Sequence, residues 1–134
     1  MIKDIPVPEV NDIAVAVIPE EDENEELAWS VYLLNLKDTP IEGVLVSSKG
    51  YGELNGEQIK TSTLRHFLDT LQPKSYAKIE PIMENVFPLN NEYWVSFYLN
   101  NLIYDKKFIF LPETIRQDFF VKIPLINKKG VMIR

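Results

Sequence analysis

His66 is the only histidine in the chain, and nucleophilic catalysis of the Ser-His-acid type needs such a base beside the attacking hydroxyl. Three hydroxyl side chains stand close to it in the sequence, at Thr61, Ser62 and Thr63. They do not form the nucleophile-elbow pattern, in which a serine stands between two glycines at a sharp turn. The sequence therefore favours a surface or partly packed imidazole over a catalytic one, and it predicts no catalytic residue.

Cationic side chains in the same part of the chain could bind an anion. Lys49, Lys60, Arg65 and His66 would form such a site if the loops that carry them converge, and ordinary surface charge is the alternative. The glycine-rich stretch 50–56 does not have the spacing of a phosphate-binding loop, so turn glycines explain it better. These four residues are the candidates for a binding site.

The sequence supplies no set of metal ligands, and it predicts no metal and no cofactor. Without cysteine and with a single histidine, the chain cannot build a thiolate site or a histidine-based site. The acidic run 20–26 could offer oxygen atoms to calcium, but it lacks the glycine that a calcium loop needs at its sharp turn. A solvated loop is the better interpretation of that run.

The net charge of -6 comes from this one segment. Six of the 20 acidic residues lie within 20–26, and the remaining 14 balance the 14 lysines and arginines. A neutral body with one acidic loop lacks the electrostatic footprint of a general nucleic-acid binder. Nucleic acid is therefore disfavoured as a partner, although RNA contact through Trp94, Tyr98 and the lysines stays open as an alternative.

Length and composition indicate a single domain over residues 1–134, with 46% hydrophobic residues to fill one core. Pro6 and Pro8 predict an extended arm over residues 1–11 and, with no continuous apolar run there, argue against a secretory signal. No stretch approaches the ~20 apolar residues of a membrane helix. Cytoplasmic residence is expected, with prior removal of an export signal left open. The tail 125–134 predicts a short edge strand that frays at its end.

Residues 92–111 predict the β-hairpin around which the rest of the chain packs. Asn100-Asn101 at its centre tolerates the positive φ of a tight two-residue turn. With Leu99 opposite Leu102, one face of the hairpin is nearly all apolar, and the other mixes aromatic with charged side chains. On the mixed face Trp94 meets Lys107, which favours a cation–π contact that covers the sheet.

The other segments also favour strands. Residues 59–71 are ambiguous, because apolar residues from Leu64 have helical spacing while the β-branched residues and the neighbouring segments favour a strand. We prefer the strand. The stretch 49–56 predicts a loop or hairpin tip with its turn at Asn55-Gly56. Together the pattern predicts an all-β fold, an immunoglobulin-like β-sandwich of about seven or eight antiparallel strands. Four further strands are expected at 12–18 (ended by Pro19), 28–36, 41–48 and 76–80.

Short motifs across the middle two-thirds of the chain resemble an uncharacterised family of short bacterial chains. Some members of that family carry the label of a phenylalanyl-tRNA synthetase subunit. A synthetase catalytic core is far longer and uses arginine-bearing motifs to bind ATP, which Arg65, His66, Arg116 and Arg134 do not reconstruct. The resemblance therefore implies a bacterial source and no mechanism. The motifs are Thr39-Pro-Ile-Glu42, Ser48-Lys-Gly-Tyr51, Lys60-Thr-Ser-Thr63 with Arg65-His66, Ser75-Tyr-Ala-Lys-Ile-Glu80 and Leu89-Asn-Asn-Glu-Tyr93.

A rich core without a convergent catalytic set predicts a non-enzymatic protein-interaction or structural module. Its partner would be another protein, or a second copy bound through an edge strand, since sandwiches carry function in loops and edges. The alternatives are a small enzyme, an accessory subunit of one, or a weak binder of RNA or anions. An enzyme would need a concave pocket in which polar groups converge.

Overall fold

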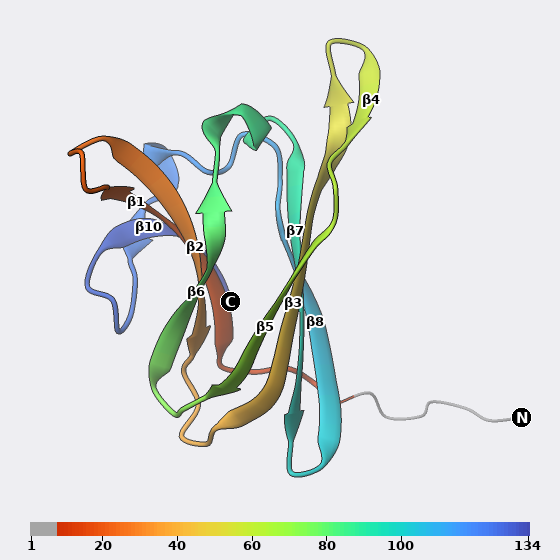
Figure 1. Cartoon of the computed structure of the whole chain (residues 1–134), viewed down its shortest axis with the longest axis vertical. Coiled ribbons are helices and arrows are strands. Elements are labelled where there is room, and N and C mark those ends of the chain that lie inside the picture. Colours follow the sequence, from red (N-terminus) through yellow and green to blue (C-terminus); the bar gives the residue numbers. More distant parts are fainter. Residues whose placement is uncertain (1–7) are drawn as a thin grey trace, which may run out of the picture.

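The structure, a computed structural model, describes residues 8–134, so most of the predicted arm at 1–11 lies outside the described residues. Within the described range the chain is all-β, with ten strands, two short 3-10 segments and no α-helix (Figure 1). In chain order the elements are β1 (Ile13–Glu21), β2 (Leu27–Asn35), β3 (Ile41–Leu54), β4 (Glu57–Lys60), β5 (Leu64–Leu71), β6 (Ser75–Ile82), η1 (Glu84–Val86), β7 (Asn90–Leu99), β8 (Leu102–Phe110), η2 (Gln117–Phe119), β9 (Val121–Lys122) and β10 (Lys129–Ile133).

The strands form two antiparallel sheets that face each other, as a β-sandwich requires (Figure 1). The first sheet has the order β6-β2-β1-β10-β9, and the second has β4-β3-β7-β8, with β5 also paired to β3. The predicted all-β sandwich is confirmed, and the immunoglobulin-like topology stays a prediction. The described chain has ten strands instead of about seven or eight, because β3 continues to Leu54 and returns as β4, and because a two-residue β9 joins the first sheet.

The central hairpin is confirmed in register and in turn. Leu99 pairs with Leu102 and Trp94 with Lys107, as predicted. Asn100 and Asn101 have φ values of 51° and 63°, which is the left-handed backbone that a two-residue turn demands. The ambiguous segment 59–71 is also extended, since β4 and β5 occupy most of it.

Pro19 does not end β1, which contradicts the expectation from the sequence. The strand continues to Glu21, and Pro19 pairs with Trp29 of β2. On its other side β1 pairs with β10 only from Val15 to Val17, so no neighbouring strand requires the missing N–H of Pro19. A proline is tolerated here because this end of β1 is open on one side.

The C-terminal strand is not at an edge of its sheet, again unlike the expectation. β10 lies between β1 and β9, with Val131 opposite Val17 and Ile133 opposite Val15. The strand is therefore an internal element of the first sheet, and the two-residue β9 takes the edge.

The main core lies between the sheets and consists of their inward side chains, including Val17, Val46, Phe97 and Phe108. A second, smaller core covers the outer face of the first sheet. There Ala14 and Ala16 of β1 are fully buried, with Leu125 and Ile126 of the segment before β10 packed against the same cluster. The chain thus shields the outer face of β1 and β2 with its own residues.

Glu20 attaches this covering segment to the first sheet. Its Oε2 accepts a hydrogen bond from Lys128 Nζ at 2.6 Å, and its Oε1 accepts one from the Tyr32 hydroxyl at 2.6 Å. Partial burial opposes the charged form, but the bonds from Lys128 and Tyr32 outweigh it and lower the pKa of Glu20. The same arrangement raises the pKa of Tyr32 to about 12, through burial first and then the Glu20 carboxylate.

Glu20→Gln is expected to destabilise the protein by about 1 kcal/mol at neutral pH, because the charged acceptor of two hydrogen bonds is lost. Because the pKa of Glu20 is lower in the folded than in the unfolded state, the charged carboxylate stabilises the fold at pH values above its ordinary pKa. This stabilisation is lost as the pH falls through the lowered pKa of the folded state. Urea unfolding at neutral pH and near pH 3 should therefore show the two proteins converging in acid. Glu21→Gln, at an exposed neighbouring position, is the control and should match the parent at both pH values. A difference that persists in acid would contradict the assignment.

Candidate functional site

The four cationic candidates do not form one site, because strand alternation divides them between two faces. His66 pairs with Val46, which is fully buried, and so faces the other sheet. Arg65 pairs with Ser47 and Lys60 pairs with Tyr51, and these two lie with Lys49 on the outer face of the second sheet. The structure therefore brings Lys49, Lys60 and Arg65 to one surface and places His66 on its opposite side.

His66 belongs to a polar cluster centred on Glu80 of β6. Glu80 Oε1 lies 2.7 Å from His66 Nε2 and accepts the Ser48 hydroxyl at 2.7 Å, while Oε2 accepts the Tyr93 hydroxyl at 3.1 Å. The Glu80 side chain is 12% exposed. Burial, and then the Glu80 carboxylate, hold the pKa of Tyr93 well above its usual range, so its hydroxyl stays protonated and donates. One carboxylate of the first sheet thus contacts β3, β5 and β7 of the second.

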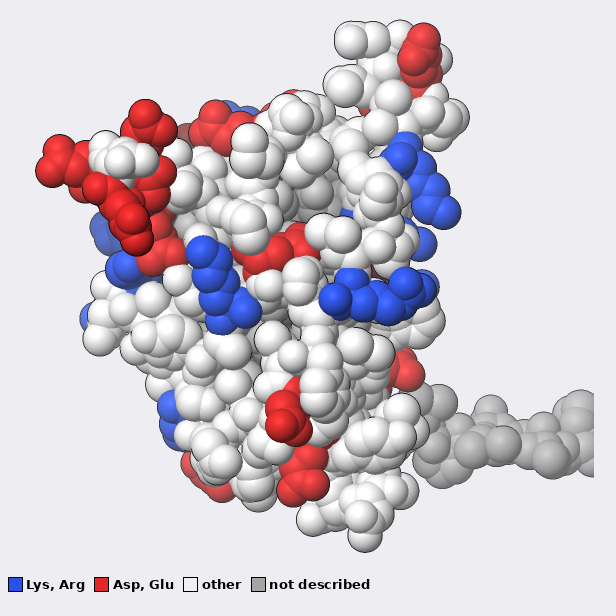
Figure 2. Space-filling view, in the orientation of Figure 1, with Lys and Arg blue, Asp and Glu red and all other residues white. Residues whose placement is uncertain are grey.

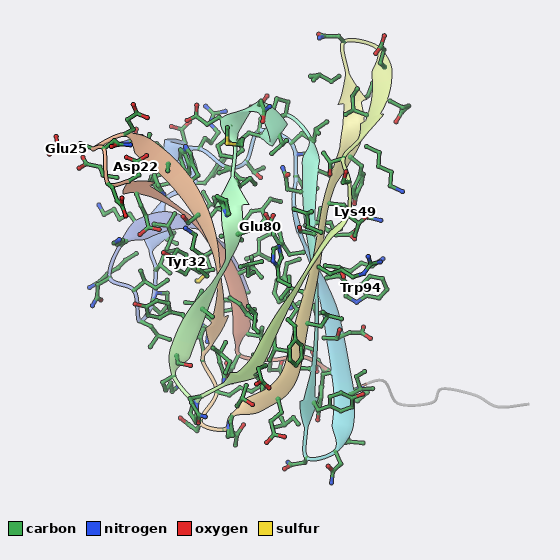
Figure 3. The ribbon with its side chains drawn as sticks, in the orientation of Figure 1. Asp22, Glu25, Tyr32, Lys49, Glu80 and Trp94 are labelled. Atoms are coloured by element: carbon green, nitrogen blue, oxygen red, sulfur yellow. The ribbon has the colours of Figure 1, made fainter. Side chains whose placement is uncertain are left out.

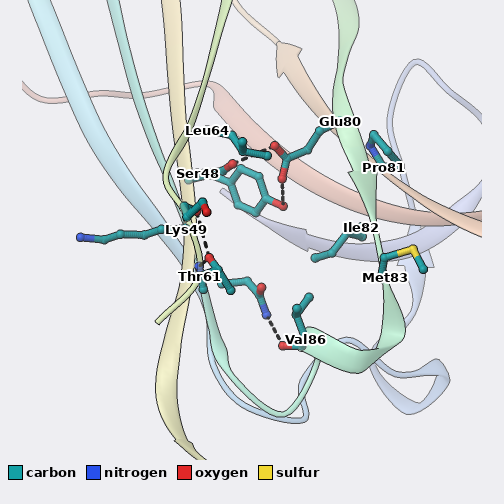
Figure 4. A pocket seen from close by; sticks show the side chains of 13 residues that line it. Ser48, Lys49, Thr61, Leu64, Glu80, Pro81, Ile82, Met83 and Val86 are labelled. Carbon is teal, nitrogen blue, oxygen red and sulfur yellow. Dashed lines mark hydrogen bonds between the residues drawn. The ribbon is translucent and has the colours of Figure 1, made fainter. Parts of the chain in front are cut away.

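A cavity of about 310 Å³ opens beside this cluster, between the edges of the two sheets (Figure 4). Its polar wall includes Ser48, Thr61 and Glu80, and its apolar wall includes Ile82 and Val86. Lys49 lines the cavity only with the atoms nearest its backbone, because its side chain points away from the cavity (Figure 4). The concave shape is the one that a small-molecule site would need.

The bonding pattern in the cluster differs from that of a nucleophilic triad. A triad places the imidazole between the hydroxyl and the acid, so that the base can take the hydroxyl proton. Here the acid lies in the middle, and the same oxygen of Glu80 accepts from both Ser48 and His66. Within residues 8–134 every buried side-chain nitrogen or oxygen has a hydrogen-bond partner. Ser48, His66 and Tyr93 all donate hydrogen bonds to the Glu80 carboxylate. These bonds link the two sheets beside the cavity.

Sequence reasoning named His66 but missed Glu80, Ser48 and Tyr93. Simple alternation in β6 would place Glu80 on the outside with Tyr76 and Lys78, both of which are exposed. The pairing with β2 shifts between Val31 and Tyr32, and this bulge turns Glu80 inward. The only sequence signal was Pro81, which indicates either the end of the strand or a sheet edge. The strand continues to Ile82, and β6 is the edge of the first sheet.

The outer face of the second sheet carries large apolar side chains that no other part of residues 8–134 covers. The residues are between 37% and 67% exposed, which is unusual for so many on one sheet face. Pairing places Leu45 between Phe67 and Ser96, and Trp94 between Ser47 and Lys107. The apolar members are Leu45, Phe67, Trp94, Tyr98 and Ile103.

Cations border these apolar side chains. Lys107 Nζ lies 4.6 Å from the centroid of the Trp94 ring, which confirms the predicted cation–π contact. Arg65 stands in the same row, across Ser47. Lys49 forms an ion pair with Glu92 at 3.8 Å, and Lys60 follows in the next row along β3. Three acids share this sheet face: Glu92 beside Lys49, Glu42 opposite Tyr98 and Asp105 opposite Ser96. We call the five apolar residues with Lys49, Lys60, Arg65 and Lys107 the basic–aromatic face.

Two further findings concern the described residues. No three His, Cys, Asp or Glu side chains of residues 8–134 gather in a way that could hold a metal ion. No helix in that range is long and apolar enough to cross a membrane. In comparisons with known proteins, no family model, no curated protein and no solved structure matches the chain.

Proposed function

We propose that the chain is a non-enzymatic protein-interaction module and that it binds its partner through the basic–aromatic face. The observation that supports this most is the difference between the two outer faces. The first sheet is covered over β1 and β2 by its own chain at Leu125 and Ile126, and leaves Tyr76 exposed on its edge strand. The second sheet leaves Phe67, Trp94 and Tyr98 exposed. Exposed apolar side chains cost solubility, and on a folded domain a contiguous group of them indicates an interaction surface.

The composition of the face supports a protein partner. Protein interfaces are enriched in tryptophan, tyrosine and arginine, and such residues dominate binding energies. Trp94, Tyr98 and Arg65 supply these types on one face of the sheet. Cytoplasmic residence and the relation to the family of short bacterial chains are consistent with this role and stay predictions.

Site-specific photo-crosslinking tests the proposal. A photoreactive residue at Leu45, in the middle of the face, is expected to capture one defined protein in cells that express the chain. The same residue at Lys129, on an exposed position of β10, is the matched control. Trp94→Ala should reduce capture from Leu45 at least tenfold, because truncating an anchor residue costs about 2 kcal/mol or more of binding.

Two other results would contradict the proposal, and the second would favour the alternative function of a small enzyme. Equal yields from Leu45 and Lys129 would remove the face as an interaction surface. Turnover of a small molecule that His66→Ala abolishes would show that the cavity beside Glu80 is the functional site.

A further inference from the structure

The β1–β2 loop presents a compact set of carboxylates in a defined conformation. Asp22 Oδ1 accepts the backbone N–H groups of Asn24 at 2.8 Å and of Glu26 at 2.9 Å, and Glu25 adopts a φ of 60° to complete the turn. Asp22 is therefore used inside the loop, and Glu20 is bonded to Lys128 and Tyr32. The turn is held in shape without using the carboxylates at its tip.

The tip carboxylates have no cationic partner within the described residues. Glu21, Glu23, Glu25 and Glu26 are all exposed, and none forms an ion pair with a cation of residues 8–134. The next residue, Leu27, is 62% exposed, so the loop offers an apolar side chain beside its negative charges. The loop thus combines the two features that complement a basic, apolar surface.

The basic–aromatic face offers the matching cations. Arg65, Lys60 and Lys107 form no ion pair with an acid of residues 8–134. Arg65 and Lys107 lie in one row with Trp94, and Asp105 lies in the next row. An acidic segment laid along the row of Trp94 would meet these cations while its apolar side chain covers Trp94 or Phe67. Rows of the sheet are about 7 Å apart, so a short loop can reach several cations at once.

The two surfaces cannot meet within one molecule, because they lie on opposite sides of it. Figure 3 labels Asp22 and Glu25 at one side and Lys49 and Trp94 at the other. Figure 2 shows the red cluster of the β1–β2 loop at the far corner from the blue side chains along β3 and β5. Any contact between them has to join two copies.

We propose that the acidic β1–β2 loop of one copy docks on the basic–aromatic face of a second copy. The inference rests on the proposed function, because it names the occupant of the interaction face. The contact is head-to-tail, since each copy uses its loop on one neighbour and its face on the other. Such contacts extend into open chains unless the geometry closes a ring.

Exposed ion pairs are individually weak, and they weaken further as salt screens them. The association should therefore be modest and should decline as salt rises from about 50 mM to about 500 mM. Burial of the Trp94 and Phe67 rings supplies a part that salt does not remove.

A mixing experiment with two charge-neutralised proteins tests the contact. The face variant is Arg65→Gln with Lys107→Gln, and the loop variant is Glu23→Gln with Glu25→Gln. In sedimentation velocity at low salt the parent should show a mass that rises with concentration. Each variant alone should associate at least tenfold more weakly, because one half of every contact is impaired.

The mixture of the two variants is the decisive sample. The intact loop of the face variant fits the intact face of the loop variant, so a one-to-one complex should form and stop there. The controls remove the same number of charges elsewhere: Lys122→Gln with Lys129→Gln, and Glu53→Gln with Glu57→Gln. Both controls should associate like the parent.

Three results would overturn the inference. The first is a parent that stays monomeric at every concentration and at low salt. The second is association that the face variant does not change, which would assign it to another surface such as the β6 or β8 edge. The third is binding of a single-stranded uridine oligonucleotide to the parent that Trp94→Ala weakens. This result would identify the face as a nucleic-acid-binding surface. A monomeric parent whose photo-crosslink from Leu45 still captures another protein would leave the interaction module standing.

Discussion

Gly130→Ala is expected to destabilise the protein by about 3 kcal/mol or more, near the upper end of overpacking effects. A Cβ at this position would lie 2.3 Å from the Val17 carbonyl oxygen and 3.2 Å from the Ile18 Cα. Both contacts are to the backbone of β1, so no side chain can move aside to relieve them. The methyl group must separate β10 from β1, which are neighbours in the first sheet.

Urea unfolding of Gly130→Ala measures the effect, and Gly56→Ala is the matched control. Gly56 has a φ of 79° and nothing within 4 Å of its added Cβ, so its replacement should cost only about 1 kcal/mol of backbone strain. A Gly130→Ala protein as stable as Gly56→Ala would show that β1 and β10 lie farther apart than the structure has them.

Glu80→Ala is expected to cost about 3 kcal/mol, since it leaves buried donors without their acceptor. Ser48, His66 and Tyr93 all donate to this carboxylate, and Tyr93 is only 2% exposed. The loss should therefore exceed that of any single partner, such as Ser48→Ala at about 1 kcal/mol.

Denaturant unfolding of Glu80→Ala, Ser48→Ala and Glu57→Ala separates these effects. Glu57 is an exposed glutamate at the start of β4, and its replacement should stay within about 0.5 kcal/mol of the parent. An unchanged stability in Glu80→Ala would mean that the cluster does not tie the sheets together. It would also return the cavity beside Glu80 to consideration as a reactive site.

Glu80 also helps to protect the exposed edge of β6 against pairing with another molecule. An inward-pointing charge and a bulge both discourage a strand of another molecule from adding to an exposed edge. β6 has both, at Glu80 and at the register shift opposite Val31, and it has Pro81 as well. The sequence led us to expect self-association through an edge strand. For these reasons the β6 edge is a poorer route to it than docking on the basic–aromatic face.

The central hairpin and its face were predictable because their causes lie in consecutive residues. Asn100-Asn101 sets the turn, the turn sets the register, and alternation then places Trp94 beside Lys107. The all-β class follows in the same way from short alternating segments between turn signals. The local pattern at Leu64 was ambiguous, and extended pairing with β3 decided it in favour of a strand.

Tertiary structure alone decided which residues meet from distant strands. The bulge in β6 reverses alternation and carries Glu80 inward, and pairing with β3 sends His66 toward it while Arg65 goes to the other side. Whether Pro19 ends a strand depended on β10 leaving that stretch of β1 open. The chain itself encodes turns and alternation, because neighbours along the backbone control them. Register shifts, and the choice of which strands lie side by side, depend on residues far apart in the sequence. These long-range contacts determine which residues meet at the candidate site.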